Sequence, residues 1–455
     1  LAEGEYMTQA TQVDVIYGLE DRPPVGEAVV AALQHLLAIF VGIITPTLVL
    51  SGPLGLDRET TAYLVSMALM VSGVATFIQV KKIGAIGSGL LSIQGTSFAF
   101  IGPMITAGLA VGGGEAGLAL IFGLALAGAP IEMVFSRFIH LAKNIITPVV
   151  TGTVVLLIGL SLINVGMTDL AGGFGAEDFG GARNVGLGAL VIVTVIVLNL
   201  SKNKYLRMGS IVIGLAVGYI VAAMMGMVSI GSLGDLPAVS VPIPFKFGLD
   251  FDFALFIPFA ILYLITTIES TGDLTATSMV SGEPIEGDVY IERIKGGVLG
   301  DGVNSAIAAT FNTFPNTTFS QNNGVIQLTG VASRYVGMFI AGLLVILGLF
   351  PAIGGFLSSM PKPVLGGATL IMFGTVAAAG IKIIASAKVG RREMLILAVS
   401  LGLGLGVQMV PEVLSSFPDL AKTIFASTIT TGGLSALILN LIIPRDVGEI
   451  PVDAA

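Results

Sequence analysis

Cysteine and tryptophan are absent from this chain of 455 residues, and histidine occurs only twice, as His35 and His140. Without cysteine, neither a disulfide framework nor a thiolate metal site can form. Two histidines are too few for a histidine-rich metal centre, so we expect no metal and no cofactor. The sequence also lacks an HExxH motif and a cysteine–histidine pair, so we expect no enzyme.

Charged residues are scarce as well. They make up 11% of the chain, against roughly 25% in soluble domains, while hydrophobic residues make up 54%. Apolar runs of about 20 residues recur, which indicates an all-α protein that crosses the lipid bilayer many times. The net charge of −8 includes no basic stripe, so no nucleic-acid partner is expected. Residues 1–26 are acidic and lack an apolar core, which predicts a tail and not a cleaved signal peptide, with Met7 as a possible natural start.

The apolar runs predict fourteen membrane segments. Eleven have full length: 27–48, 60–80, 115–136, 144–165, 184–201, 207–229, 250–272, 333–356, 362–385, 392–410 and 420–443. Three are shorter or partly polar: 91–111, 296–312 and 321–332. With this count, sixteen of the 21 Lys and Arg residues fall on the side of the two termini and five on the other side. The positive-inside rule therefore predicts that both termini are cytoplasmic.

Two of these segments resemble each other. TPVVTGTVVLLIG (147–159) and KPVLGGATLIMFG (362–374) share a proline and two glycines at an offset of 215 residues. One such match can arise by chance, because proline and small residues are common in membrane helices. They are, however, the fifth and twelfth segments, which predicts a repeat of seven helices. A repeat with an odd number of helices is inverted relative to its twin, as in many secondary transporters.

The third and tenth segments are also seven apart, and both are unusual. LLSIQGTSFAF (90–100) and TTFSQNNGVIQL (317–328) each begin as an extended stretch, continue with polar and small residues, and then stay apolar for only two to three turns. Extended chain in lipid leaves backbone groups unpaired, so we expect the two stretches to pair with each other inside the protein. The half-helices that follow would direct free N–H groups from near Thr96 and Asn322 into one cavity.

Ionisable residues within membrane segments are functional candidates, because each charge costs roughly 3 kcal/mol to insert. Glu269 and Asp273 lie four residues apart, on one face of a helix. Two carboxylates this close in a low-dielectric site are not both expected to be ionised, which predicts one proton carrier and one ligand acceptor. The alternative for Asp273 is an ordinary charge at a helix end, and for Asp301 an interfacial helix cap.

Two other ionisable residues have simpler interpretations. His35, in the first segment, is interpreted as a structural hydrogen-bond donor, with a proton relay as the alternative. Glu132 precedes Arg137 and His140 near a predicted cytoplasmic helix end. We therefore expect Glu132 to snorkel toward the interface or to support a gate.

The stretch QNNGVIQLTG (321–330) resembles the signature of the nucleobase–ascorbate transporter family. EDRPP (20–24), GSGLLSIQGTSF (87–98) and FPNTTFSQNNGVIQLTGVASRYVG (314–337) are similar to its bacterial xanthine and uric acid permeases. ESTGD (269–273) resembles the E-x-x-G-D of purine-transporting members, whereas uracil permeases have a histidine in place of the aspartate. The resemblance covers residues 15 to 445.

This resemblance implies a fourteen-helix fold of two inverted seven-helix repeats. Cytoplasmic tails (1–26 and 444–455) would flank a core domain (27–143 and 250–356) and a gate domain (144–230 and 357–443). The function implied is import of xanthine or uric acid across the bacterial cytoplasmic membrane by proton symport. Transport would occur by an elevator-like movement of the core against the gate, often in a homodimer.

The resemblance also implies roles for single residues. Glu269 would hold the purine ring nitrogens, Gln321 would form a bidentate amide contact, and Phe98 would stack on the base or offer its backbone N–H. Ser320 would contribute a backbone contact and Asn322 would support Gln321, with Asn323 as the cap of the half-helix. His35, Asp273 and Asp301 would be tied to proton coupling. Ala99 replaces the Asn that bacterial xanthine permeases have after TSF, which favours uric acid or a broader range of purines.

Three other classes of function fit less well. A channel would show a continuous polar stripe through several helices, whereas the polar residues here are concentrated at two breaks. An anion transporter of the same fold would avoid two carboxylates beside its site. A uracil permease is the nearest alternative, and Asp273 disfavours it.

Overall fold

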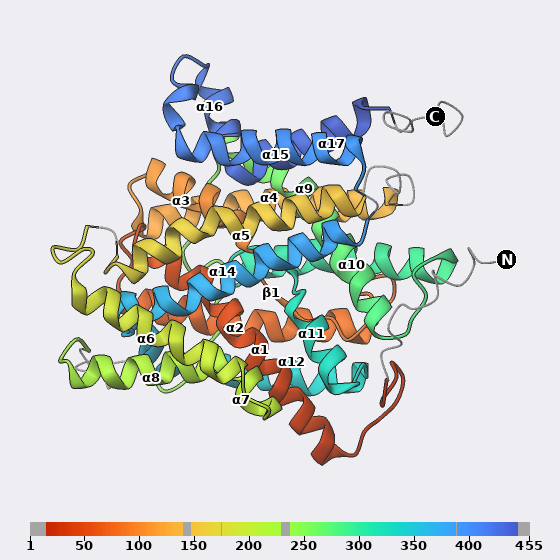
Figure 1. Ribbon diagram of the computed structural model, residues 1–455, viewed down its shortest axis with the longest axis horizontal. Coiled ribbons are helices and arrows are strands. Elements are labelled where there is room, and N and C mark those ends of the chain that lie inside the picture. The colour runs from red at the N-terminus through yellow and green to blue at the C-terminus, as the bar shows by residue number, and fades with distance from the viewer. Residues whose placement is uncertain (1–14, 140–146, 174, 229–236, 388, 445–455) are drawn as a thin grey trace, which may run out of the picture.

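The computed structural model describes residues 15–139, 147–173, 175–228, 237–387 and 389–444. His140 therefore lies outside the described residues. The long helices lie side by side and run roughly along one common direction (Figure 1). In the part of the chain that the structure describes, eight helices are long and apolar enough to cross a membrane, and a bent pair adds a ninth.

The helices of the first half of the chain are α1 (Val25–Ser51), α2 (Arg58–Lys81), η1 (Phe98–Phe100), α3 (Ile101–Ala110), α4 (Gly114–Phe138), α5 (Pro148–Leu170), α6 (Ala182–Asn199), α7 (Lys204–Met208) and α8 (Ser210–Met224). Those of the second half are α9 (Phe253–Val280), α10 (Gly287–Thr310), α11 (Gln321–Thr329), α12 (Arg334–Gly348), α13 (Pro351–Ser358), α14 (Lys362–Ala385), α15 (Arg391–Met409), η4 (Pro411–Leu414), α16 (Asp419–Phe425) and α17 (Thr428–Ile442). Each predicted segment thus corresponds to a helix or a broken helix.

Some predicted boundaries were wrong. The segment predicted at 207–229 is interrupted at Gly209, and the one at 333–356 is bent by 77° between α12 and α13. Pro351 starts α13, where its missing N–H cannot continue the hydrogen bonding of α12. Helix α9 extends to Val280, well beyond the predicted end at 272, and α10 begins at Gly287 instead of 296.

Two short strands cross in the interior. Strand β1 (Gln94–Thr96) pairs antiparallel with β2 (Asn316–Thr318), with Gln94 opposite Thr318 and Thr96 opposite Asn316. This confirms the prediction that the extended stretches of the third and tenth segments pair with each other. All six strand residues are buried, so the backbone groups of each strand satisfy those of the other in a region without water.

The helices form two groups by their packing. Helix group 1 comprises α1 to α4 and α9 to α13, in which α2 packs on α12, α4 on α9 and α10, and α1 on α2 and α12. Helix group 2 comprises α5, α6, α8, α14, α15 and α17, in which α5 packs on α14 and α17, and α6 on α8 and α14. Both strands and both half-helices lie among the elements of helix group 1.

Glycines allow α5 and α14 to approach closely. Gly152 lies against Ile384, Gly159 against Ala377 and Gly166 against Leu370, so the two helices run antiparallel. A Cβ atom on Gly159 would lie 2.4 Å from the backbone nitrogen of Ala377, which leaves no room for a side chain. The two segments that carry the internal sequence match are therefore in direct contact.

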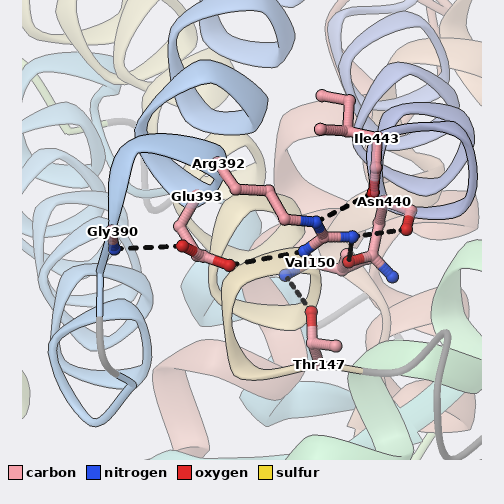
Figure 2. A network of polar contacts seen from close by, with 7 residues as sticks. All are labelled: Thr147, Val150, Gly390, Arg392, Glu393, Asn440 and Ile443. Carbon is pink, nitrogen blue, oxygen red and sulfur yellow. Dashed lines mark hydrogen bonds and ion pairs between the residues drawn. The ribbon is translucent and has the colours of Figure 1, made fainter. Parts of the chain in front are cut away.

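A buried arginine at the start of α15 is hydrogen-bonded to the end of α17 (Figure 2). The Arg392 guanidinium donates hydrogen bonds to the carbonyl of Ile443 at 3.0 Å and to the carbonyl of Asn440 at 2.6 Å. It also contacts Glu393, which in turn accepts from the backbone N–H of Gly390 at 3.0 Å. Arg392 thus satisfies carbonyls at the end of α17, which a helix C-terminus otherwise leaves unpaired.

The N-terminal segment holds the far end of the half-helix α11. The backbone N–H groups of Ile16 and Tyr17 donate to the carbonyl of Gly330, and the N–H of Ala332 donates to the carbonyl of Tyr17 at 2.8 Å. Arg334 forms an ion pair of 2.6 Å with Glu20. These contacts fix the end of α11 and the start of α12.

Candidate functional site

Two half-helices begin where the strands end. Ser97 precedes η1 and α3, and Ser320 precedes α11; neither serine caps its helix with a side-chain hydrogen bond. The first N–H groups of a helix have no partner within the helix, so both starts offer donors to a ligand. The positive ends of two helix dipoles also favour acceptor groups at this level of the protein.

Glu269 and Asp273 lie on α9, inside the protein and not at its end. Asp273 is 3% exposed and Glu269 is half-buried. Among the described residues, neither carboxyl group accepts a hydrogen bond, and Oε2 of Glu269 is buried without a partner. At this level α9 meets helix group 2, because a Cβ on Gly272 would lie 2.4 Å from Cγ2 of Thr151. The interpretation of Asp273 as an ordinary helix-end charge is therefore wrong.

Asp301 is the centre of a fully buried hydrogen-bond network. Its Oδ1 accepts from Nε2 of Gln79 at 2.6 Å, and its Oδ2 accepts from Oγ of Ser270 at 2.5 Å. The hydroxyl of Thr318 donates to the same carboxylate at 3.1 Å. These partners come from α2, α9 and β2. Because Asp301 lies in the middle of α10, the alternative of an interfacial helix cap is wrong.

The network continues into the crossing strands. Gln79 accepts from the N–H of Ser88 at 2.8 Å and donates to the carbonyl of Gly297 at 2.8 Å. Gln94 of β1 donates to the hydroxyl of Thr318 at 2.9 Å. Gln79, Gln94 and Asp301 thus each have hydrogen-bond partners, and the network links α2 and α10 to both strands.

The polar residues at the start of α11 have different neighbours and different roles. Gln321 is half-buried, and its side chain forms no hydrogen bond with the described residues. Asn322 is fully buried, and its amide donates to the carbonyl of Leu91, so that this bond links α11 to the segment before β1 instead of supporting Gln321. The prediction that Asn323 caps the half-helix is wrong: Ser320 is the N-cap, and Asn323 accepts from the hydroxyl of Thr277 at 2.7 Å.

His35 lies next to Asn322. Its ring is completely buried on α1, and the Asn322 side chain is its polar neighbour. Neither ring nitrogen reaches hydrogen-bond geometry with a described residue, nor does Oδ1 of Asn322. The expected structural hydrogen bond is therefore not formed in this conformation, although the two side chains that would form it are adjacent.

Phe98 lies at the contact between the two helix groups. Its ring stacks on Phe319 with 6.2 Å between centroids and an angle of 17°, and it meets Phe373 of α14 edge-on at 5.7 Å. A cavity of about 190 Å³ lies beside Phe98 and is bounded by α3, α5, α9 and α17; neither Glu269 nor Gln321 lines it. Ala99 is 1% exposed and does not line this cavity.

The expectation that Glu132 snorkels was wrong. Its side chain is 1% exposed, with both carboxyl oxygens buried, so it does not snorkel to an interface.

The sequence analysis did not identify Gln79, Ser270 and Thr318 as members of the site. The signal that identified Glu269, an acid with apolar residues on its N-terminal side, was present for Glu132 as well. No such signal exists for Gln79, because its partner lies 222 residues away in the sequence.

Among the described residues, no group of three or more acidic or histidine side chains is arranged to hold a metal ion. The polar groups of this region are carboxylates, amides and hydroxyls beside an aromatic ring. Such a set can hold a flat ligand that carries both hydrogen-bond donors and acceptors.

Comparisons with known sequences identify close relatives. The profile of the Permease family (Xan_ur_permease) matches residues 26–413. Xanthine permease XanP of Escherichia coli (strain K12) is 48% identical over 97% of both chains, and Xanthine permease XanQ of the same strain is 49% identical over 95% of this chain and 94% of the relative. Uric acid permease PucJ of Bacillus subtilis (strain 168) is 35% identical over 92% of this chain and 93% of the relative.

Solved structures share the fold at low sequence identity. The transmembrane domain of the cyanobacterial bicarbonate transporter BicA has a TM-score of 0.56 at 15% identity, over 93% of this chain and 99% of that chain. Murine Slc26a9, an anion transporter, has a TM-score of 0.60 at 11% identity, over 93% of this chain and 68% of that chain. These likenesses establish a helical membrane transporter fold.

Proposed function

The chain belongs to the nucleobase–ascorbate transporter family, and on that premise we propose that it imports xanthine or uric acid together with protons. Its resemblance over nearly the full length of xanthine permeases makes it a purine nucleobase permease. The observation that carries the proposal is the position of Glu269 and Gln321 on the packed helices α9 and α11, beside the crossed strands. Both side chains keep their hydrogen-bonding capacity for a ligand.

The chemistry of these groups suits a purine. Xanthine and uric acid present alternating N–H donors and C=O acceptors on a flat ring. A glutamate accepts two N–H bonds, a glutamine amide gives one and takes one, and helix N-termini donate to carbonyls. An analogue that leaves these buried groups unpaired would bind poorly, which is how selectivity would arise. Ala99 behind Phe98 is the position that we propose to broaden the range beyond xanthine.

Proton coupling is supported by the two acids of α9. Glu269 and Asp273 are close in space, and the described residues supply no donor to either. Binding a purine against two unpaired carboxylates is favourable only if one of them carries a proton. Substrate and proton would therefore enter together, and we propose proton symport on this basis.

We further propose that helix group 1 is the core domain (27–143 and 250–356) and helix group 2 the gate domain (144–230 and 357–443). The contacts of Phe98 with Phe373 and of Gly272 with Thr151 support a candidate site between the two groups. A movement of one group along the other would expose this region to alternate sides of the membrane. The proposal includes fourteen spans in two inverted repeats, cytoplasmic termini, the bacterial cytoplasmic membrane and a homodimer.

An anion transporter of the same fold is the second candidate, because the solved structures that share the fold include a bicarbonate transporter. The acids of α9 and α10 oppose it, since carboxylates repel an anion in a site of low dielectric.

The decisive test is uptake of labelled xanthine, urate and uracil into cells that lack purine permeases, with and without a protonophore. We expect the cells to take up xanthine or urate. An excess of unlabelled uracil should inhibit this uptake only weakly, and the protonophore should abolish it. A preference for uracil would support a pyrimidine permease, and uptake that persists with the protonophore would contradict proton symport.

A further inference from the structure

Glu132 is an acid whose burial the transport site does not explain. It lies on α4, is 1% exposed, and has no hydrogen-bond partner for either carboxyl oxygen among the described residues. A buried polar group without a partner is rare in folded proteins and calls for a physical reason. The reason begins with the packing of α4.

Small residues bring α4 into the seam between α9 and α10. On one side, a Cβ on Gly128 would lie 2.3 Å from the Tyr263 ring, whose hydroxyl donates to the carbonyl of Ala125 at 2.9 Å. On the other side, a Cβ on Gly302 would lie 2.9 Å from the backbone nitrogen of Met133. Glu132 follows Gly128 by one helical turn, so its side chain enters this seam and is shielded from lipid and water.

The groups that face Glu132 are acids and a phenol. Asp301 of α10 and Glu269 of α9 are the acids that act on it electrostatically, and Tyr263 of α9 is a further titratable neighbour. Helix α3, which also packs on α4, contains no titratable residue.

Glu132 and Asp301 differ in the number of hydrogen-bond donors around their carboxyl groups. Asp301 accepts hydrogen bonds from Gln79, Ser270 and Thr318, which can compensate a negative charge. Glu132 has no such donors and has two acids nearby. An ionised carboxylate buried in this way would cost at least several kcal/mol, which makes Glu132 a candidate site for a proton.

We propose that Glu132 is a second proton carrier of the permease, in addition to the acids of α9. This proposal rests on the proposed proton symport. The proton on Glu132 exchanges with Glu269: one O–H bond breaks on the donor acid and one forms on the acceptor carboxylate, so that the charge of the pair is conserved. Release to water then occurs through Glu269, when the movement of helix group 1 along helix group 2 exposes the candidate site.

The test is the accumulation ratio of xanthine in proteoliposomes at a fixed inward pH gradient. A gradient of one pH unit contributes a factor of about ten in accumulation for each coupled proton. The Glu132→Gln variant keeps the volume of the side chain and removes the titratable group. We expect it to bind xanthine as the wild type does and to lose about one factor of ten in accumulation per pH unit.

Matched controls separate this effect from local damage. Glu115→Gln removes an exposed acid from the same helix, and Ser136→Ala perturbs a buried residue one turn beyond Glu132. Both should accumulate xanthine as the wild type does. If Glu132→Gln does not fold, Glu132→Asp retains the acid in a shifted position and should move the pH profile of uptake along the pH axis.

Two results would overturn the role of Glu132. One is a Glu132→Gln variant whose accumulation ratio equals that of the wild type, and the other is an unchanged pH profile in Glu132→Asp. If the accumulation ratio of the wild type does not depend on the pH gradient, the proposed symport itself is contradicted. The two failures are therefore distinguishable in the same experiment.

Discussion

Gln79 on α2 donates a hydrogen bond of 2.6 Å to Asp301 on α10, across 222 residues of sequence. The same carboxylate accepts from Ser270 and Thr318, so one acid joins two further helices and a strand to α10. This bond fixes the strand crossing relative to the helices that carry the candidate ligand groups. It also makes Asp301 primarily a structural centre of the site.

Asp301→Asn is expected to destabilise the protein. The new amide keeps one oxygen that can accept from Nε2 of Gln79, but its NH2 group replaces the oxygen to which Ser270 and Thr318 donate. Each buried donor left unpaired costs about 1–3 kcal/mol, so the apparent melting temperature in detergent should fall. The control is Asp273→Asn, because Asp273 accepts no hydrogen bond among the described residues and should melt near the wild type. Equal stability of Asp301→Asn and the wild type would contradict the network.

Glu269→Gln should abolish purine binding without loss of expression. No described residue donates to the Glu269 carboxyl group, so the fold loses nothing, whereas the ligand loses an acceptor for its N–H groups. Equilibrium binding of labelled xanthine to purified protein is the measurement. Retained affinity would remove Glu269 from the proposed site.

Gln321→Ala should weaken purine binding by an amount typical of a lost buried hydrogen bond, about 1–3 kcal/mol or roughly 5- to 150-fold in Kd. Gln327→Ala, an exposed residue on the same half-helix, provides the control and should bind as the wild type does. If both variants bind equally well, the amide of Gln321 faces away from the ligand.

Gly95→Ala should disturb the aromatic pair beside the strands. A Cβ at this position would lie 2.4 Å from the Phe319 ring, which stacks on Phe98. Phe319 must move or the strands must separate, so we expect a large loss of transport. Gly102→Ala on α3, where a Cβ meets nothing within 4 Å, should transport normally. Normal uptake by Gly95→Ala would show that the ring pair is not required.

Arg392→Ala should lower the thermal stability of helix group 2. The substitution removes the hydrogen bonds from the guanidinium to the carbonyls of Asn440 and Ile443, and hydrogen bonds to a charged group contribute about 1.5–3 kcal/mol each. Arg391, the adjacent and exposed arginine, is the matched control, and Arg391→Ala should melt as the wild type does. A pair of variants with the same melting temperature would show that the network in Figure 2 adds no stability.

Much of the fold was predictable because hydropathy and helix breaks are local properties. The apolar runs located every segment, and for α14 the predicted range, 362–385, equals the observed one. The polar residues after Phe319 and the matching stretch before Phe98 identified the two broken helices. Their strand pairing followed from a general requirement, that extended backbone inside a membrane protein must find hydrogen-bond partners.

The identity of those polar residues was less predictable than their presence. The pattern grouped Asn322 and Asn323 with Gln321, but the structure directs their side chains to Leu91 and Thr277. Adjacent residues on a helix point in directions about 100° apart, so each meets a different neighbour. Only the packing around α11 decides which neighbour that is.

The sequence by itself determined that this is a polytopic membrane protein of the nucleobase transporter family, with paired broken helices and acids inside the membrane. Only the tertiary structure decided that Asp301 is saturated with donors while Glu132 has none. The physical reason is that the sequence states which residues of a helix are polar, whereas their hydrogen-bond partners depend on which helix faces pack together. Gly128 and Gly302 allow α4 to pack closely against α9 and α10, and this packing buries Glu132.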